Sequence, residues 1–225
     1  MTQSDASSRQ SALDRLTANA PFLARLAELN PDDVTRFLGD GTDAALAAGV
    51  APPVDDDIMV RLRRWRGRIA LLLALGDLSG EHDVAATTRH LTVFADAACD
   101  AALAAAFAER VPDEVPQGLS VIALGKLGSH ELNYSSDIDP ILISDPETLP
   151  RRSRDDPGEA AVRIARRMVE ILSARTGDGH VLRVDLRLRP HPEVTPIVLP
   201  VNAAISYYES EALAWVQAAF IRSRA

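Results

Sequence analysis

Residues 125–139, with the sequence GKLGSHELNYSSDID, decide how this chain of 225 residues folds. They follow a largely apolar run, Leu119 to Leu124, which is bounded by turn-forming residues and is typical of a buried strand. They lead into a second apolar stretch, Asp137 to Ser144, which we also predict to be a strand. The glycine-containing segment therefore joins two strands, and polar side chains gather at the point where the two strands meet.

The sequence before this point is predicted to be helical. Apolar residues recur at intervals of three to four in residues 55–69, and a small-residue stripe predicts a second helix over Val84 to Ala108. Turn-forming residues at 111–118, VPDEVPQG, predict a boundary between a helical N-terminal region, 1–110, and a second domain, 111–225. In that second domain we predict a helix over Glu159 to Arg175 and helical structure from about Asn202 to Arg224.

Composition excludes several classes of protein. A net charge of −8 lacks the basic surface of a dedicated nucleic-acid binder, so we expect no DNA or RNA partner. Strictly apolar runs such as Ile69 to Leu75 are far short of the ~20 residues that cross a bilayer, and the N-terminus lacks an export signal. A single cysteine, Cys99, can form neither an internal disulfide nor a cysteine-based zinc site. We therefore expect a cytoplasmic protein without a membrane span.

The five histidines show no paired spacing of the kind that transition-metal sites use. We therefore expect surface or capping roles for them rather than ligand roles. The histidines are His82, His90, His130, His180 and His191.

Residues His180 to Arg189 alternate strictly between apolar and charged side chains, which predicts a third strand. Side chains alternate with a period of two, so one face would carry Arg183, Asp185, Arg187 and Arg189. A solvated strand face with cross-strand ion pairs explains this pattern as well as a binding site does.

The segment Asp137-Ile138-Asp139 is a candidate binding site for a divalent cation. In an extended chain the two carboxylates lie on one face, about 7 Å apart at the backbone, and Ile138 points into the core. Two such charges repel, and a divalent cation offsets the repulsion; hard oxygen donors suit Mg²⁺ bound together with phosphate groups. The alternative is a pair at a strand edge that binds no metal.

The loop at residues 125–129 is the third polar feature. Its two glycines allow a ligand to approach the backbone closely, Ser129 adds a hydroxyl, and exposed amides in such a turn can bind an anion. It is not a Walker A loop, because neither serine nor threonine follows Lys126 directly. A plain turn between two strands is the alternative interpretation. Lys126 is the only lysine in the chain.

Together these features resemble a known superfamily. Gly128-Ser129, seven intervening residues, Asp137-x-Asp139 and then Asp185 are similar to the pattern of the nucleotidyltransferases that include DNA polymerase beta. The wider context, 125–139, 183–190 and Tyr207-Tyr208-Glu209-Ser210, resembles the bifunctional glutamine synthetase adenylyltransferase/adenylyl-removing enzymes. That resemblance extends back to residues 21–26 and covers nearly the whole chain. It implies an α+β fold with a DNA polymerase beta-like mixed sheet and a preceding helical layer.

The resemblance also implies an activity. Segments 131–136 and 183–190 are similar to the N-terminal half of that family, which removes AMP from a tyrosine of glutamine synthetase by phosphorolysis to ADP, and so regulates nitrogen assimilation. By analogy, Asp137, Asp139 and Asp185 would be catalytic and would bind one or two Mg²⁺ or Mn²⁺ ions. Gly128 and Ser129 would cradle phosphate, and Arg187 or Arg189 would pair with a phosphoryl oxygen. The implied partners are glutamine synthetase, inorganic phosphate and an adenine nucleotide.

Two alternatives stay open at this stage. Pro140 stands where the family usually has an aliphatic residue, and proline removes a ladder donor directly after the second aspartate. Because the family continues well beyond the length of this chain, we expect a truncated piece or one of two split halves. The alternatives are a noncatalytic module that binds glutamine synthetase or a PII signal protein, and the opposite, adenylylating direction with ATP as donor.

Overall fold

The computed structural model describes residues 3–48 and 57–225, which form two compact units, Met1–Phe94 and Ala95–Ala225. The division falls inside one long helix, α6 (Val84–Arg110), whose two parts belong to different units. The boundary expected after residue 110 lies at the end of this same helix and stays a prediction.

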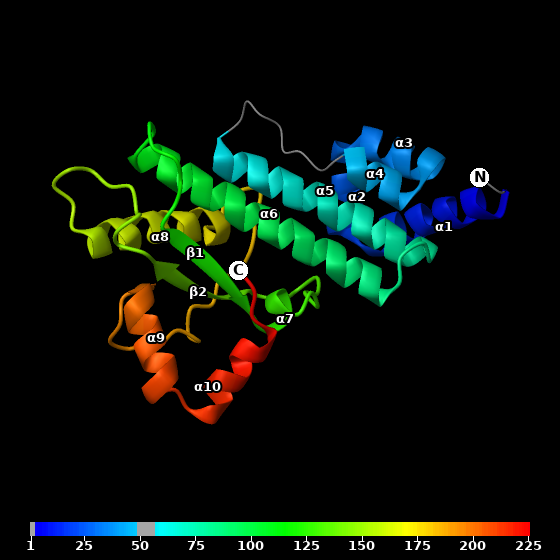
Figure 1. The fold of residues 1–225 in the computed structure, drawn as a ribbon. Coiled ribbons are helices and arrows are strands. Elements are labelled where there is room, and N and C mark those ends of the chain that lie inside the picture. The colour runs from blue at the N-terminus through cyan, green and yellow to red at the C-terminus, as the bar shows by residue number, and fades with distance from the viewer. Residues whose placement is uncertain (1–2, 49–56) are drawn as a thin grey trace. The chain divides into compact units, whose positions relative to one another are not determined.

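Unit 1 is helical throughout its described residues, as the sequence predicts. Besides the first part of α6 it holds α1 (Gln3–Asn19), α2 (Pro21–Leu29), α3 (Pro31–Asp40), α4 (Thr42–Ala48) and α5 (Ile58–Ser79). Helices α1 and α5 lie side by side (Figure 1). The predicted helix over 55–69 is the first half of α5, and its residues 55 and 56 lie outside the described part of the chain.

Local sequence signals set the helix ends in unit 1. Prolines occupy the first turns of α2 and α3, where a missing N–H costs nothing. The Asp57 side chain accepts a hydrogen bond from the Met59 amide at 2.7 Å and so caps α5, which ends at Gly80 in a left-handed conformation. The bidentate pair of Arg68 with Asp33, at 2.7 and 2.8 Å, connects α5 to α3.

Unit 2 combines a small sheet with helices. Its elements are the second part of α6, β1 (Leu119–Leu124), α7 (Gly125–Gly128), β2 (Asp139–Ser144), α8 (Pro157–Ser173), β3 (Val198–Pro200), α9 (Val201–Ser210), α10 (Ala214–Ala219) and the 3-10 turn η1 (Phe220–Arg222). The predicted helices at 84–108 and 159–175 correspond to α6 and α8. The helix expected from 202 to 224 is interrupted, because residues 211–213 separate α9 from α10.

The sheet is mixed and has the order β1-β2-β3. Strand β1 pairs with β2 in antiparallel register from Leu119↔Ser144 to Leu124↔Asp139, and β2 pairs with β3 in parallel from Leu142↔Val198 to Ser144↔Pro200. Helices α8 and α9 both pack against β2 and β3 (Figure 1). The mainly apolar β2 is thus buried along most of its length, and its first residue, Asp139, lies where the core ends.

The third strand predicted over 180–189 is wrong in extent. In the structure, Val184 forms a single parallel bridge with Ile138, and the chain turns away at residues 187 and 188. The Ile138 amide donates to the Arg183 carbonyl and the Asp185 amide donates to the Ile138 carbonyl, both at 2.9 Å. The next bond of a parallel ladder would need an N–H at residue 140. Pro140 has none, so the pairing stops after Asp185.

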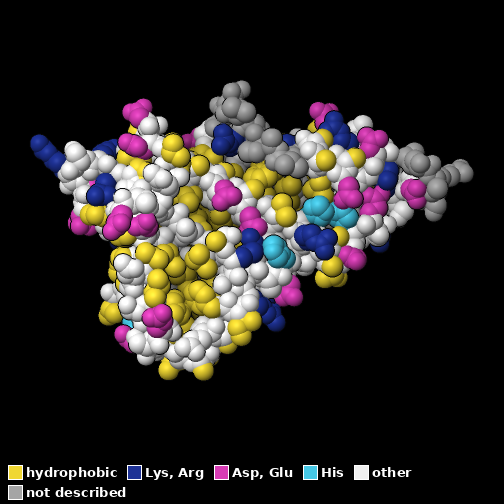
Figure 2. All heavy atoms as spheres, viewed as in Figure 1, with side chains coloured by type: hydrophobic (Ala, Val, Ile, Leu, Met, Phe, Trp, Pro, Cys, Tyr) yellow, Lys and Arg dark blue, Asp and Glu magenta, His cyan; other side chains and the backbone are white. Residues whose placement is uncertain are grey.

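The end of the described chain returns to the sheet. The Ala123 amide donates to the Arg224 carbonyl at 2.7 Å and the Arg224 amide donates back at 3.1 Å, on the side of β1 opposite β2. Figure 2 shows apolar side chains gathered on the viewed face of unit 2. Exposed large apolar residues in and around α9 and α10 are Ile205, Leu213, Trp215 and Ile221.

Helix α6 is long and apolar enough to cross a membrane by length and composition, which the search for apolar runs alone did not predict. Core helices of soluble proteins pass the same test, and 44% of its most apolar 18-residue window is buried. Leu91 and Phe94 are buried within unit 1, and Cys99 and Phe107 within unit 2. Burial at these positions favours a core helix.

Candidate active site

The strand register brings Asp139 to the end of β1. Asp139 is the first residue of β2 and pairs with Leu124, the last residue of β1. The next residue, Gly125, has a φ of +56°, and a Cβ built on it would lie 2.9 Å from Oδ2 of Asp139. The Asp139 carboxylate therefore lies directly against the backbone of Gly125, in space that any other residue at this position would occupy.

The bridge between Ile138 and Val184 brings Asp185 to the same side of the sheet as Asp139. Side chains alternate along an extended segment, so the residues directly before and after a bridged residue point to the opposite side of the sheet from it. Ile138 is fully buried, so Asp137 and Asp139 point away from the core, as does Asp185 from its place beside Val184. The predicted convergence of these three residues is thus consistent with the backbone, although the strand expected around Asp185 is reduced to a single bridge.

The charges of the three aspartates affect one another. The pKa of Asp139 is raised by burial first and then by the negative charges of Asp137 and Asp185, while Arg187 and Lys126 oppose that rise. Asp137 is exposed and Asp139 is half-buried. A half-buried carboxylate between two others is electrostatically strained, and a positive ion would relieve that strain.

Asp185 already has a cationic partner. Nε of Arg187 lies 2.9 Å from Oδ1 and 2.7 Å from Oδ2 of Asp185, and the Arg187 amide donates to Oδ1 at 2.9 Å. These hydrogen bonds lower the pKa of Asp185. The Arg187 side chain is 84% exposed, so its charged end can move without disturbing the core.

The three carboxylates do not form a closed coordination shell. Among the described residues, the one group of three or more histidine, cysteine and acidic residues whose ligand atoms all lie within 4.8 Å of one another is elsewhere, in unit 1. The trio instead forms an open, solvent-facing acidic surface around Asp139. Open carboxylate sites of this kind suit Mg²⁺, which keeps several waters and shares its shell with substrate phosphates.

The glycine segment differs from the predicted loop. Residues 125–128 form the single helical turn α7, and the Ser129 hydroxyl lies 3.1 Å from the Gly125 carbonyl and 3.0 Å from Oε2 of Glu131. Gly128 is buried, and a Cβ on it would lie 2.1 Å from the carbonyl oxygen of Arg222. The absence of a side chain at Gly128 thus makes room for this chain's own C-terminal segment.

Arg189, the last of the site residues predicted from the sequence, stabilises the turn in which it lies. Its guanidinium donates to the carbonyls of Leu186 at 2.7 Å and Pro192 at 2.6 Å. Of the two arginines singled out from the sequence, Arg187 therefore stands beside the carboxylates, and Arg189 braces the segment that carries them.

Two neighbours of Asp139 had no assigned role in the sequence-based site. Gly125 supplies the space for the carboxylate, and Lys126 supplies a positive charge close enough to lower the pKa of Asp139. The sequence signal for Lys126 was its uniqueness in a chain whose other cationic residues are all arginine.

Comparison with known proteins supplies an independent line of evidence. The family profile described as glutamate-ammonia ligase adenylyltransferase matches residues 11–225. Proteins called bifunctional glutamine synthetase adenylyltransferase/adenylyl-removing enzyme are similar: that of Xanthobacter autotrophicus is 42% identical over 93% of this chain, and that of Rhizobium meliloti is 40% identical over 92%. The protein of Caulobacter vibrioides is 42% identical over 92%.

This chain is much shorter than those relatives, because the matched region spans 23% of the length of each of the three. The family match, in contrast, extends through both units and includes all three aspartates. The chain, mostly helical with a small mixed sheet, therefore belongs to the glutamate-ammonia ligase adenylyltransferase family.

Proposed function

We propose that this chain carries a nucleotidyltransferase site that removes AMP from an adenylylated tyrosine of glutamine synthetase, with inorganic phosphate as acceptor and ADP as product. The observation that carries the proposal is the placement of Asp137, Asp139 and Asp185 on one side of the Ile138–Val184 bridge, close enough to raise the pKa of Asp139. Family membership supports nucleotidyl transfer, and the names of the relatives supply the protein substrate.

The donor set fits a divalent cation. Three carboxylates at an open, water-accessible edge are hard oxygen ligands, and the pKa of Asp139 is raised first by burial and then by the negative charges of the other two. Asp137, Asp139 and Asp185 would hold Mg²⁺ or Mn²⁺. When bound, such an ion neutralises charge on the phosphoryl oxygens and fixes the geometry of in-line displacement.

The residues of the chain have separate tasks in this proposal. An oxygen of inorganic phosphate bonds to phosphorus as the bond between phosphorus and the tyrosine oxygen breaks, and that tyrosine oxygen then takes up a proton. Arg187, which is exposed in its pairing with Asp185, is placed to exchange that carboxylate for a phosphoryl oxygen, which its guanidinium binds in a bidentate manner. Lys126 adds positive charge on the β1 side of the site.

The direction of the reaction and the assignment to the removing half rest on the likeness of segments 131–136 and 183–190 to the N-terminal half of the family. The reverse direction would use the same carboxylates, with ATP as donor. The two directions are distinguished by supplying either adenylylated glutamine synthetase with phosphate or unmodified enzyme with ATP.

The decisive experiment measures release of ADP from adenylylated glutamine synthetase in the presence of phosphate and Mg²⁺. Substitution Asp137→Asn is expected to lower the rate about 10³-fold, which corresponds to about 4 kcal/mol of transition-state stabilisation. Asp178→Asn is a matched control, because Asp178 lies in an exposed turn of the same unit. Equal rates for wild type and Asp137→Asn would refute the catalytic role of the trio.

Absence of turnover by wild type in both directions would favour a noncatalytic module that binds glutamine synthetase or a PII signal protein. Pro140 is the sequence feature that raised this alternative. In the structure, Pro140 sits in regular pairing opposite Ala123, and Asp139 beside it keeps its place at the strand end. The proline therefore ends the pairing of Ile138 with residues 183–185 without removing the carboxylate from the site.

A further inference from the structure

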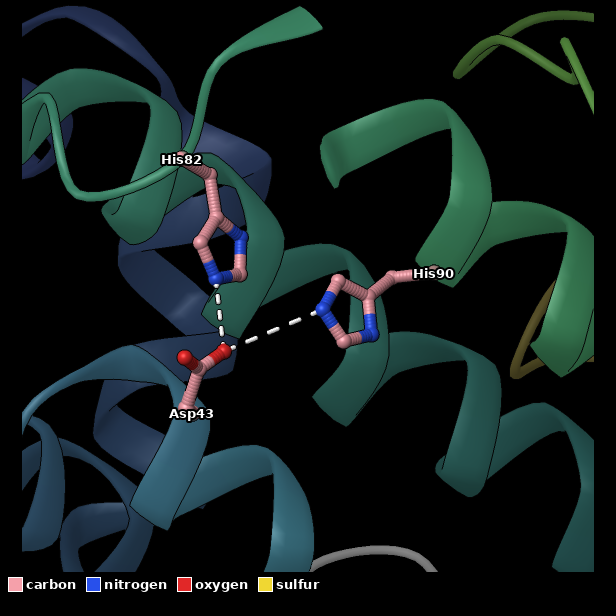
Figure 3. Close-up of side chains that lie close together, drawn as sticks. All are labelled: Asp43, His82 and His90. Carbon is pink, nitrogen blue, oxygen red and sulfur yellow. Dashed lines mark hydrogen bonds and ion pairs between the residues drawn. The ribbon is translucent and has the colours of Figure 1, made fainter. Parts of the chain in front are cut away.

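A second cluster of ligating side chains lies wholly within unit 1. Asp43 is in the first turn of α4, His82 is in the connection between α5 and α6, and His90 is in α6 (Figure 3). Nε2 of His82 lies 2.9 Å from Oδ1 of Asp43, and Nε2 of His90 lies 3.8 Å from the same oxygen. Figure 3 shows both imidazoles turning these nitrogens toward Asp43.

The sequence predicts surface or capping roles for these histidines, and the structure differs from that expectation at His82, which is buried. His82 and His90 are eight residues apart, and within one helix that separation would place them about 12 Å apart along the axis, too far to share an ion. The connection before α6 removes that limit, because His82 lies outside the helix. His82 is 6% exposed, and its ring is nearly parallel to that of His90, with centroids 5.0 Å apart.

Neighbouring contacts hold the cluster in position. The Thr42 amide and hydroxyl both donate to Oε2 of Glu81 at 2.7 Å, and Arg9 forms an ion pair with the other Glu81 oxygen. Residues 42 and 43 thus face residues 81 and 82 in two consecutive contacts, one through Glu81 and one through His82. A ligand set supported in this way loses little conformational freedom when an ion binds.

The donor atoms of the cluster also favour one kind of cation. Two imidazole nitrogens and one carboxylate oxygen form a donor set of mixed nitrogen and oxygen, which suits Zn²⁺ and not Mg²⁺.

We propose that Asp43, His82 and His90 form a Zn²⁺ site, with the two Nε2 atoms and a carboxylate oxygen as ligands. In a tetrahedral shell with bonds of about 2.0–2.1 Å, ligand atoms lie about 3.3 Å apart. The distances of 2.9 and 3.8 Å bracket that value, and all three ligand atoms lie within 4.8 Å of one another. Small side-chain rotations, together with transfer of the His82 proton from Nε2 to Nδ1, would therefore bring the three ligands into a tetrahedral shell with one open position.

The same geometry indicates an exchangeable site rather than a closed structural one. The Asp43 side chain is 84% exposed and that of His90 is 38% exposed, which leaves the fourth position to water. Nδ1 of His82 is buried without a hydrogen-bond partner, whereas zinc-bound histidines usually donate this second nitrogen to an acceptor. Lack of that partner typically weakens metal affinity about 10–100-fold. The ion would connect α4 to α6 reversibly and stabilise unit 1 according to zinc concentration.

Titration calorimetry with ZnCl₂ on the chelator-treated full chain tests this site, with millimolar Mg²⁺ present to occupy the acidic cluster. We expect one equivalent of zinc to bind and the melting temperature to rise. His90→Gln is expected to weaken binding at least about 10-fold while the metal-free melting temperature is unchanged, since His90 is partly exposed. His82→Gln is the second variant, and its melting curve without zinc shows whether it folds.

Two controls separate this site from other sources of zinc binding. His191→Asn removes an imidazole that lies 3.1 Å from Glu211 in unit 2, and Asp137→Asn removes a carboxylate of the acidic cluster. Both are expected to keep the zinc equivalent. Binding that survives His90→Gln and Asp43→Asn, binding that is lost in Asp137→Asn, or no binding by wild type would each overturn the proposal. Visible absorption of a Co²⁺ complex, present in wild type and lost in His90→Gln, would confirm coordination.

Discussion

The acidic cluster of unit 2 and the histidine cluster of unit 1 are both built from segments distant in sequence, but their charges are balanced in opposite ways. Around Asp139 three carboxylates face one arginine and one lysine, and the pKa of Asp139 is raised. Around Asp43 a single carboxylate accepts from His82 at 2.9 Å. The first cluster is strained without a cation, whereas the second is already satisfied by a hydrogen bond.

A shared feature makes this contrast informative. A glycine lies behind one ligand of each cluster: a Cβ on Gly125 would lie 2.9 Å from Oδ2 of Asp139, and a Cβ on Gly76 would lie 3.1 Å from Nδ1 of His82. Close packing against backbone therefore positions a ligand in both places. The proposed difference in metal preference therefore rests on the donor atoms, because hard carboxylates favour Mg²⁺ and imidazoles favour Zn²⁺.

Among the variants that compare the two clusters, Gly125→Ala is expected to have the largest effect. The new Cβ would collide with the Asp139 carboxylate, and the φ of +56° would add a backbone cost of about 1–2 kcal/mol. A displacement of about 1 Å at a catalytic group can cost about 10²-fold in rate. We therefore expect ADP release to fall about 100-fold, measured with adenylylated glutamine synthetase.

Two other glycines in unit 2 separate backbone strain from displacement of the carboxylate. Gly179 has a φ of +87°, but a Cβ added to it would meet nothing within 4 Å, so Gly179→Ala carries strain alone. Gly177→Ala has neither strain nor a close neighbour. If Gly179→Ala lowers the rate as much as Gly125→Ala does, displacement of Asp139 is not the cause of the lower rate in Gly125→Ala.

Part of the acidic cluster was predictable from the sequence, because two of its three carboxylates are close in local structure. Asp137 and Asp139 are two residues apart in an extended segment, which places them on one side by geometry alone. The strand expected around Asp185 failed because a single residue on its partner, Pro140, lacks the N–H that the ladder needs. Periodicity within one segment does not reveal whether a partner can pair with it.

The histidine cluster was not predictable in the same way. It depends on the fold that brings Asp43 in α4 to His82, 39 residues away, and on the loop that releases His82 from the helix. Likewise the space around Gly128 is taken by Arg222, which no local pattern indicates. The helical character of unit 1 was predictable because apolar spacing acts locally, although the helix expected over 55–69 continues to Ser79.

A smaller effect, on stability, distinguishes the two clusters directly. Because the pKa of Asp139 is raised in the folded protein, the folded state holds its proton more strongly, and stability falls as pH rises through the range between the ordinary and the raised pKa. Asp139→Asn removes this penalty at neutral pH. We expect the metal-free melting temperature to rise by a few degrees at most, and the stabilisation by Mg²⁺ to be lost.

Asp43→Ala is the counterpart in unit 1 and should act in the opposite direction. It removes the acceptor of the His82 hydrogen bond, which is worth about 1 kcal/mol, so the metal-free melting temperature should fall. Differential scanning calorimetry in chelator measures both variants. A fall for Asp139→Asn together with a rise for Asp43→Ala would mean that the charge balance of the two clusters has been assigned the wrong way round.

The smallest effect is expected from a change at Arg187, an exposed residue whose positive charge partly offsets the negative charge of the acidic cluster. Its hydrogen bonds lower the pKa of Asp185, and its charge opposes the rise in the pKa of Asp139. Arg187→Ala is therefore expected to raise both pKa values, which titration of the aspartate carboxyl carbons by NMR would measure. The pKa of His90, which depends on burial, His82, Asp43 and Arg89, should stay the same and serves as the internal control. Unchanged pKa values for both aspartates would show that Arg187 does not balance their charge, and its exchange from Asp185 to a phosphoryl oxygen would then lose its electrostatic basis.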